Sequence, residues 1–73
     1  MPKPDPVKLA ARGQRLTAAR QAKQLTQAQV AQCLGRDVAT VSRWEQGSID
    51  PSVDDLKALC ELYGATVDSI LAD

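Results

Sequence analysis

The chain has 73 residues, of which 44% are hydrophobic and 25% are charged, and its formal net charge is zero. This length forms one small domain and leaves no room for a second core or a catalytic lobe. Two cysteines and no histidine exclude a four-ligand zinc site and a dense disulfide framework. We therefore expect no metal and no cofactor, and we expect Cys33 and Cys60 to be buried, reduced thiols.

Membrane and export signals are also missing from the sequence. No stretch approaches the roughly 18 consecutive apolar residues of a membrane span. The segment Met1-Pro2-Lys3-Pro4-Asp5-Pro6 lacks the apolar stretch of a signal peptide. The expected location is the cytoplasm, with no membrane partner.

The zero net charge conceals an asymmetry along the chain. Residues 1–23 carry a net charge of +5, and residues 48–73 carry a net charge of −5. A polyanion would be attracted to the first segment and repelled by the second. The charged residues are Lys3, Lys8, Arg12, Arg15, Arg20, Lys23 and Asp5 in the first segment, and Lys57, Asp50, Asp54, Asp55, Glu61, Asp68 and Asp73 in the second.

Apolar residues recur at spacings of three and four, and the chain is rich in alanine, leucine and glutamine, so an all-α fold is predicted. Prolines make residues 1–6 a flexible arm, and residues 7–73 form the domain. The first helix is expected from Val7 to Lys23. Its Arg20 lies on the inward side, and its Gly13 would let another backbone approach closely.

Two short helices follow, separated by a tight turn. Thr26 and Gln29 form a capping box at the start of one helix, and Gly35 ends that helix after Leu34. Asp37 is a strong N-cap for the next helix, which is predicted to span residues 38–46. A turn of about three residues between two such helices is the helix-turn-helix geometry.

The helix at 38–46 has two different sides. Val41 and Trp44 lie about 60° apart and are expected to pack inward, whereas the other side is free to read a ligand. Ser52 caps a fourth helix that reaches about Tyr63, and Thr66 begins a short fifth helix. The predicted core stripe of the fourth helix is Val53, Leu56, Leu59, Cys60 and Tyr63.

The segment TQAQVAQCLGRDVATVSRWEQ, residues 26–46, resembles the helix-turn-helix of the lambda-repressor/Cro-like (XRE-type) DNA-binding family. Ala31 matches the small residue of the family's second helix, Gly35 the turn, and Val41 the middle of the recognition helix. The later glycine, proline and leucine positions extend the similarity to about residues 9–71. The resemblance implies a five-helix domain in which Arg20 pairs with Glu45.

The resemblance implies that the third helix enters the major groove of double-stranded DNA. Arg43 would donate two hydrogen bonds to a guanine, which discriminates by roughly 1–3 kcal/mol, and Ser42 would make a second contact. Val38 and Ala39 would contact a thymine methyl group. The alternative for Arg43 is a surface ion pair or a phosphate contact. The residues expected to hold phosphates are Gln27, Arg36, Thr40 and Gln46. The alternative for Gln27 is a solvent-facing polar residue without such a contact.

The sequence departs from the family's pattern in three places. Arg36 stands at a usually apolar position, the loop Ser48-Ile49-Asp50 lacks the usual basic residues, and the reading face begins with Val38 and Ala39. Because one strong base contact binds weakly, we expect a homodimer on a pseudo-palindromic site with half-sites about 34 Å apart. The expected dimer surface is Leu62, Ile70 and Leu71. The alternative is closure of the monomer core, which applies to Ile70 first, whereas Leu62 and Leu71 are the better candidates for the interface.

Two alternatives belong to other classes of function. A protein-interaction module or antitoxin-like partner would keep the fold, and its acidic rear would recruit a basic protein. An enzyme is disfavoured, because the chain has no histidine and neither cysteine has an obvious activating base. The function expected from the sequence is a regulator of transcription, acting as a repressor where its site overlaps a promoter.

Overall fold

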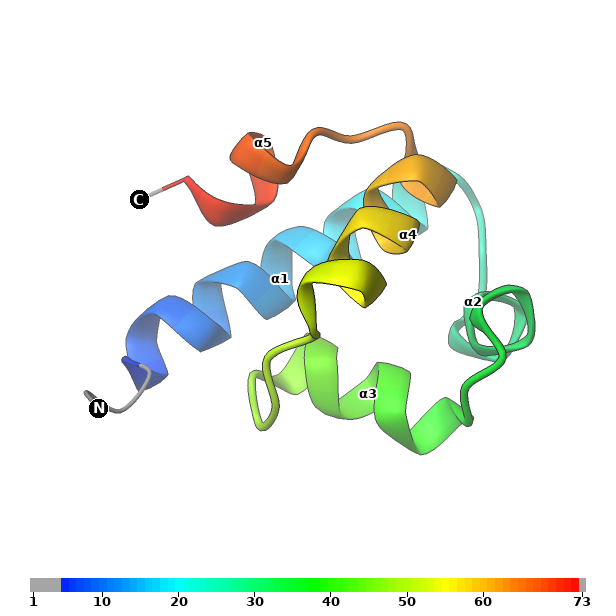
Figure 1. Ribbon diagram of the computed structural model, residues 1–73, viewed down its shortest axis with the longest axis horizontal. Helices are drawn as coiled ribbons and strands as arrows, with labels where there is room; N and C mark the ends of the chain where they lie inside the picture. Colours follow the sequence, from blue (N-terminus) through cyan, green and yellow to red (C-terminus); the bar gives the residue numbers. More distant parts are fainter. Residues whose placement is uncertain (1–4, 73) are drawn as a thin grey trace.

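The computed structural model describes residues 5–72, which form five helices and no strand (Figure 1). The predicted all-α class with five helices is therefore confirmed. The elements are α1 (Pro6–Ala22), α2 (Gln27–Leu34), α3 (Val38–Gln46), α4 (Val53–Tyr63) and α5 (Val67–Leu71). None of these described helices is both long enough and apolar enough to cross a membrane.

Helix α1 begins one residue earlier than the sequence predicted. Pro6 is its first residue, and the Asp5 side chain accepts a hydrogen bond from the backbone N–H of Val7 at 2.9 Å. Proline is tolerated at the first helical position, because the N–H that it lacks would have no partner there. The expected arm at residues 1–6 therefore loses its last residue to the helix, and its residues 1–4 lie outside the described part.

The helix boundaries follow the local capping chemistry. Thr26 and Gln29 form the predicted capping box, and the Asp37 side chain accepts from the backbone N–H of Thr40 at 3.1 Å. Gly35 ends α2 in the left-handed conformation, with φ of 68°, which a side chain would disfavour. The tight turn between α2 and α3 is therefore fixed from both ends.

The core gathers one side of every helix. Val30, Val41 and Leu59 are at most 1% exposed. Cys60 is buried as predicted, but Val53 is 69% exposed and Cys33 is exposed, so those two burial predictions were wrong. Val53 is the first residue of α4, and a helical side chain tilts toward the N-terminus, which carries it past the edge of the core.

Helix α1 lies between α3 on one side and α5 on the other (Figure 1). Gly13 makes the contact with α3 possible, because a Cβ atom at this position would lie 2.3 Å from the backbone oxygen of Glu45. The close approach that the sequence predicted at Gly13 is thus present. It brings the end of α3 against the middle of α1 and so fixes the direction of α3.

Candidate nucleic-acid interface

Helix α3 is anchored by one side and exposed on the other. Val41 is 1% exposed and Trp44 is 4% exposed. Val38 is 45% exposed, and Ala39 and Arg43 are also exposed. The two buried residues and the three exposed residues lie on opposite sides of the helix. When the first side packs inward, the second side therefore faces outward.

The Arg43 side chain makes no hydrogen bond or ion pair with any residue between 5 and 72. Its charge contributes to a lowered pKa of Asp37, although hydrogen bonds from the hydroxyl and backbone N–H of Thr40 are the larger causes. An arginine without a fixed partner keeps its five N–H donors available for a ligand. The surface ion pair considered for Arg43 is therefore not formed within this part of the chain.

The neighbours of Arg43 on α3 are polar and partly engaged. The Gln46 amide donates to the Ser42 hydroxyl oxygen at 3.0 Å, and the Thr40 hydroxyl donates to Asp37. Ser42 and Thr40 are half-buried, whereas Gln46 is exposed. The predicted base-reading residues Val38, Ala39, Ser42 and Arg43 thus share one face of a short helix.

A buried network joins α1, α2 and α3. Arg20 Nε and Nη2 donate to the Glu45 carboxylate at 2.7 and 3.1 Å, and Gln27 Nε2 donates to the same carboxylate at 2.9 Å. The Arg20 and Glu45 side chains are 12% and 6% exposed. The structure therefore forms the pair that the sequence resemblance implied, with Gln27 as a third member.

The network is electrostatically satisfied. Burial would raise the pKa of Glu45, but hydrogen bonds from Arg20, Gln27 and Thr17 outweigh it and hold this pKa below its usual value. The hydrogen bond to Glu45 also raises the pKa of Arg20. Both groups are therefore held in their charged forms, and together they fix α3 against α1.

Gln27, which the resemblance predicts to contact a DNA phosphate, is the first residue of α2. One of its amide hydrogens is engaged with Glu45, so it positions α3 in addition to any contact with DNA. Backbone N–H groups at the start of the same helix carry partial positive charge, which suits a phosphate. No local pattern indicates the bond to Glu45, because the two residues are 18 positions apart.

Two further arginines are held by acids that the sequence analysis did not pair with them. Arg36 Nη2 lies 3.1 Å from both carboxylate oxygens of Asp55 on α4. Arg12 Nη1 lies 3.3 Å from Asp50 Oδ2 in the loop between α3 and α4. Arg36 must therefore exchange Asp55 for any phosphate, and the charge of Asp50 is balanced by Arg12.

The basic stripe of α1 divides between two sides of the helix. Arg12 turns toward the loop that follows α3, whereas Arg15 Nη1 donates to the backbone oxygen of Ile70 on α5 at 3.0 Å. Because α5 and α3 lie on opposite sides of α1 (Figure 1), Arg15 faces away from the recognition helix.

One of the expected dimer residues lies inside the monomer. Ile70 is 3% exposed and belongs to the core, so its place in a dimer surface was wrong and the alternative, closure of the monomer core, is confirmed for it. The short α5 packs against α1 and α4, and this contact buries the Ile70 side chain. Leu62 and Leu71 are half-buried and pack against the core with their other sides.

Among residues 5–72, no group of three or more Cys, Asp or Glu side chains is arranged to hold a metal ion. The thiol of Cys60 has a raised pKa because it is buried, which disfavours the reactive thiolate. The chemistry on the surface of α3 is thus that of hydrogen-bond donors and small apolar groups, which suits recognition.

The comparisons with known proteins agree with this geometry. A family model described as a helix-turn-helix domain matches residues 13–71. The crystal structure of the clp gene regulator ClgR from C. glutamicum is similar, with a TM-score of 0.80 and 27% sequence identity over 92% of this chain and 87% of that chain. None of the curated proteins compared with the chain matches it.

Proposed function

Because the chain belongs to the helix-turn-helix domain family and is a DNA-binding regulator, we propose that it reads a specific sequence of double-stranded DNA through α3. The observation that carries the proposal is the exposed face of α3, where the Arg43 side chain forms no hydrogen bond or ion pair with residues 5–72. In the helix-turn-helix docking geometry the second helix lies in the major groove and its side chains contact base edges.

Arg43 is the main specificity residue in this proposal. Its guanidinium donates two parallel hydrogen bonds to O6 and N7 of one guanine, and each such bidentate contact discriminates by roughly 1–3 kcal/mol. Ser42 makes an adaptable polar contact. The exposed methyl groups of Val38 and Ala39 contact a thymine methyl group, so the preferred half-site contains both a guanine and a thymine.

Phosphate contacts position α3 in the groove. The first turn of α2, with Gln27, holds one backbone segment, and Thr40 and Gln46 hold phosphates beside the reading face. Arg36 contributes by leaving Asp55 for a phosphate. Since Arg12 of α1 is paired with Asp50 in the loop after α3, that loop adds little net attraction.

The biological unit in this proposal is a cytoplasmic homodimer that acts as a repressor without cofactor or effector. A single domain with one strong base contact gains little affinity, whereas two copies on half-sites one helical turn, about 34 Å, apart add their contacts. Leu62 and Leu71 are the half-buried apolar residues that a dimer surface would use. Repression follows where such a site overlaps a promoter.

A second candidate is a protein-interaction module or antitoxin-like partner with the same fold. It is favoured by one specific observation, which is that Arg12 and Arg36 are both held by acids within the chain. Fewer unpaired cations mean weaker attraction to the DNA backbone.

Selection from a random-sequence duplex pool separates the two candidates. The DNA reader enriches a pseudo-palindromic consensus with guanine in each half-site, and its affinity falls as salt rises. A pool that yields no consensus at low salt and micromolar protein contradicts the proposal and favours the interaction module.

A further inference from the structure

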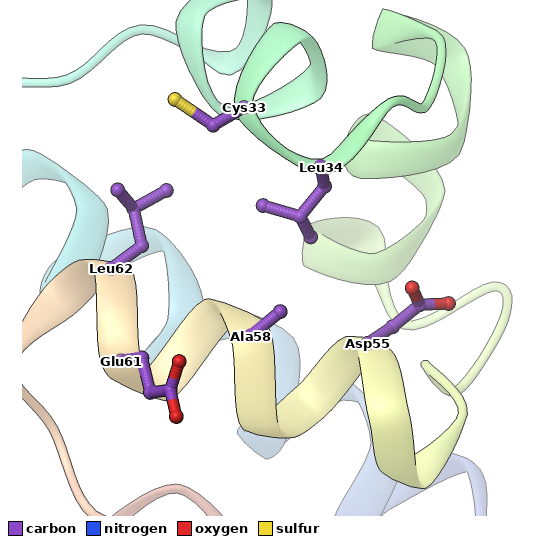
Figure 2. A pocket seen from close by; sticks show the side chains of 6 residues that line it. All are labelled: Cys33, Leu34, Asp55, Ala58, Glu61 and Leu62. Atoms are coloured by element: carbon purple, nitrogen blue, oxygen red, sulfur yellow. The ribbon is translucent and has the colours of Figure 1, made fainter.

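An open groove of about 520 Å³ lies between α2 and α4, outside the face of α3. Figure 2 shows Cys33 and Leu34 of α2 facing Leu62 and Ala58 of α4 across it. Asp55 and Glu61, both on α4, complete the lining. The groove therefore combines an apolar floor with an acidic edge.

The two acids of this edge differ in what they hold. Asp55 accepts hydrogen bonds from Arg36 and from the Ser52 hydroxyl. Glu61 is exposed, and its carboxylate makes no hydrogen bond or ion pair with any residue from 5 to 72. A groove with one uncompensated carboxylate beside an apolar floor is complementary to a partner segment in which an apolar side chain lies next to a cation.

The same chain presents such a group at the start of α1. Val7 is 75% exposed, more than any other large hydrophobic residue of the described part. It lies in a shallow hollow in which three basic residues outnumber one acid, and whose other lining residues are Asp5, Lys8, Ala11, Arg12, Arg15 and Ala72. Arg15 places part of this basic surface on the α5 side of α1, away from the recognition helix.

We propose that the α2/α4 groove of one molecule receives the first turn of α1 from a second copy, with Val7 on the apolar floor and the basic surface against Glu61. The proposal requires the net positive charge of the α1 surface and not an unpaired lysine. Two grooves facing each other would bring Glu61 against Glu61, and like charges oppose that symmetric pairing. The contact joins two different surfaces, and in the head-to-tail form that we propose each copy uses its groove toward one neighbour and its α1 toward the other.

This contact goes beyond DNA reading and does not depend on it. Because it covers Leu62, it competes with a homodimer surface that uses Leu62. It joins α1 of one copy to α2 and α4 of the next and leaves the exposed face of α3 uncovered. A head-to-tail contact has a free groove at one end and a free α1 at the other, so it adds copies in a row. Neighbouring sites on DNA would then be filled cooperatively.

Charge exchange tests the proposal with the full chain and without DNA. Glu61→Lys places a cation in the last turn of α4, and Lys8→Glu places an acid in the first turn of α1, and both changes suit the helix dipoles. Each variant alone puts like charges at the contact. A mixture of the two restores opposite charges at every contact, because each variant groove then meets the other variant's α1.

Sedimentation velocity and fluorescence anisotropy at low salt measure the association. We expect each variant alone to associate about fivefold more weakly than the wild type, which is the size of effect that exposed ion pairs give, and the mixture to recover the wild-type value. Asp54→Lys is the matched control, because it makes the same charge change on an exposed α4 position that does not line the groove.

Three results would overturn the proposal. The first is no concentration-dependent association in the wild type at low salt. The second is a mixture that associates no better than its components. The third is Asp54→Lys weakening the association as much as Glu61→Lys, which would show a net-charge effect without a docking site. Stronger self-association of Glu61→Lys alone would indicate groove-to-groove pairing and would also reject it.

Discussion

Replacing Glu45 with Gln tests the network that fixes α3. The carboxylate accepts two hydrogen bonds from Arg20 and one from Gln27, and its side chain is 6% exposed. Glutamine keeps the shape of the side chain but removes its charge. Its NH2 group, which is itself a donor, would face the N–H donors of Arg20 and Gln27 from which the carboxylate accepts hydrogen bonds. The Arg20 guanidinium, 12% exposed, is then left without an anion.

The expected loss is about 1–3 kcal/mol of unfolding free energy, since hydrogen bonds to charged groups are worth about 1.5–3 kcal/mol and an uncompensated buried charge is costly. For a domain of this size each kcal/mol lowers Tm by roughly 4–8 °C. Urea and thermal unfolding followed by fluorescence measure the loss, because Trp44 is the single tryptophan and is 4% exposed.

Glu61→Gln is the control for this measurement. It makes the same chemical change at an exposed carboxylate, where the expected effect is within about 0.5 kcal/mol. Equal midpoints for Glu45→Gln and the wild type would refute the conclusion that the network stabilises the fold. Equal losses for both variants would show a general charge effect in place of a specific contact.

Three further predictions concern the core and its titration. Gly13→Ala should destabilise the fold by about 1–3 kcal/mol, because the new Cβ would meet the backbone oxygen of Glu45 at 2.3 Å and the packed helices must separate. The midpoint of urea unfolding measures this loss, and an unchanged midpoint would contradict the close contact. Tyr63 should ionise with a pKa of about 12, since burial, and then Glu45, raise its pKa; as the only tyrosine it is followed by ultraviolet absorbance, and a midpoint near 10 would contradict its burial. Glu45 has a folded-state pKa below its unfolded value. Its contribution to the unfolding free energy is therefore complete above the unfolded pKa and is lost as pH falls through the folded pKa. Acid unfolding curves of the wild type and Glu45→Gln should converge at low pH, and a constant gap between them would contradict this assignment.

Local signals predicted the helices because capping and periodicity act within a few residues. Thr26, Gly35 and Asp37 each fix a boundary through a bond to a near neighbour, and Gly13 marks a close approach that no side chain permits. The all-α class and the exposed face of α3 followed from such signals together with the family resemblance.

Contacts between helices were harder to predict. Helical periodicity gives the direction of a side chain but not which residue of another helix it meets. Arg36 with Asp55 and Arg12 with Asp50 are charge pairs 19 and 38 positions apart, and nothing local distinguishes these pairs from other acid and base combinations. Ile70 was misassigned for the same reason, because its burial depends on how α5 folds back.

The central claim is that the exposed face of α3 reads bases through Arg43. The most direct test measures the affinities of the wild type and Arg43→Ala for the selected site and for each single-base change in it. The account predicts that Arg43→Ala loses the preference for guanine at one position of each half-site and keeps the preferences at the other positions. A uniform loss of affinity across all sequences, with the base preferences unchanged, would contradict it.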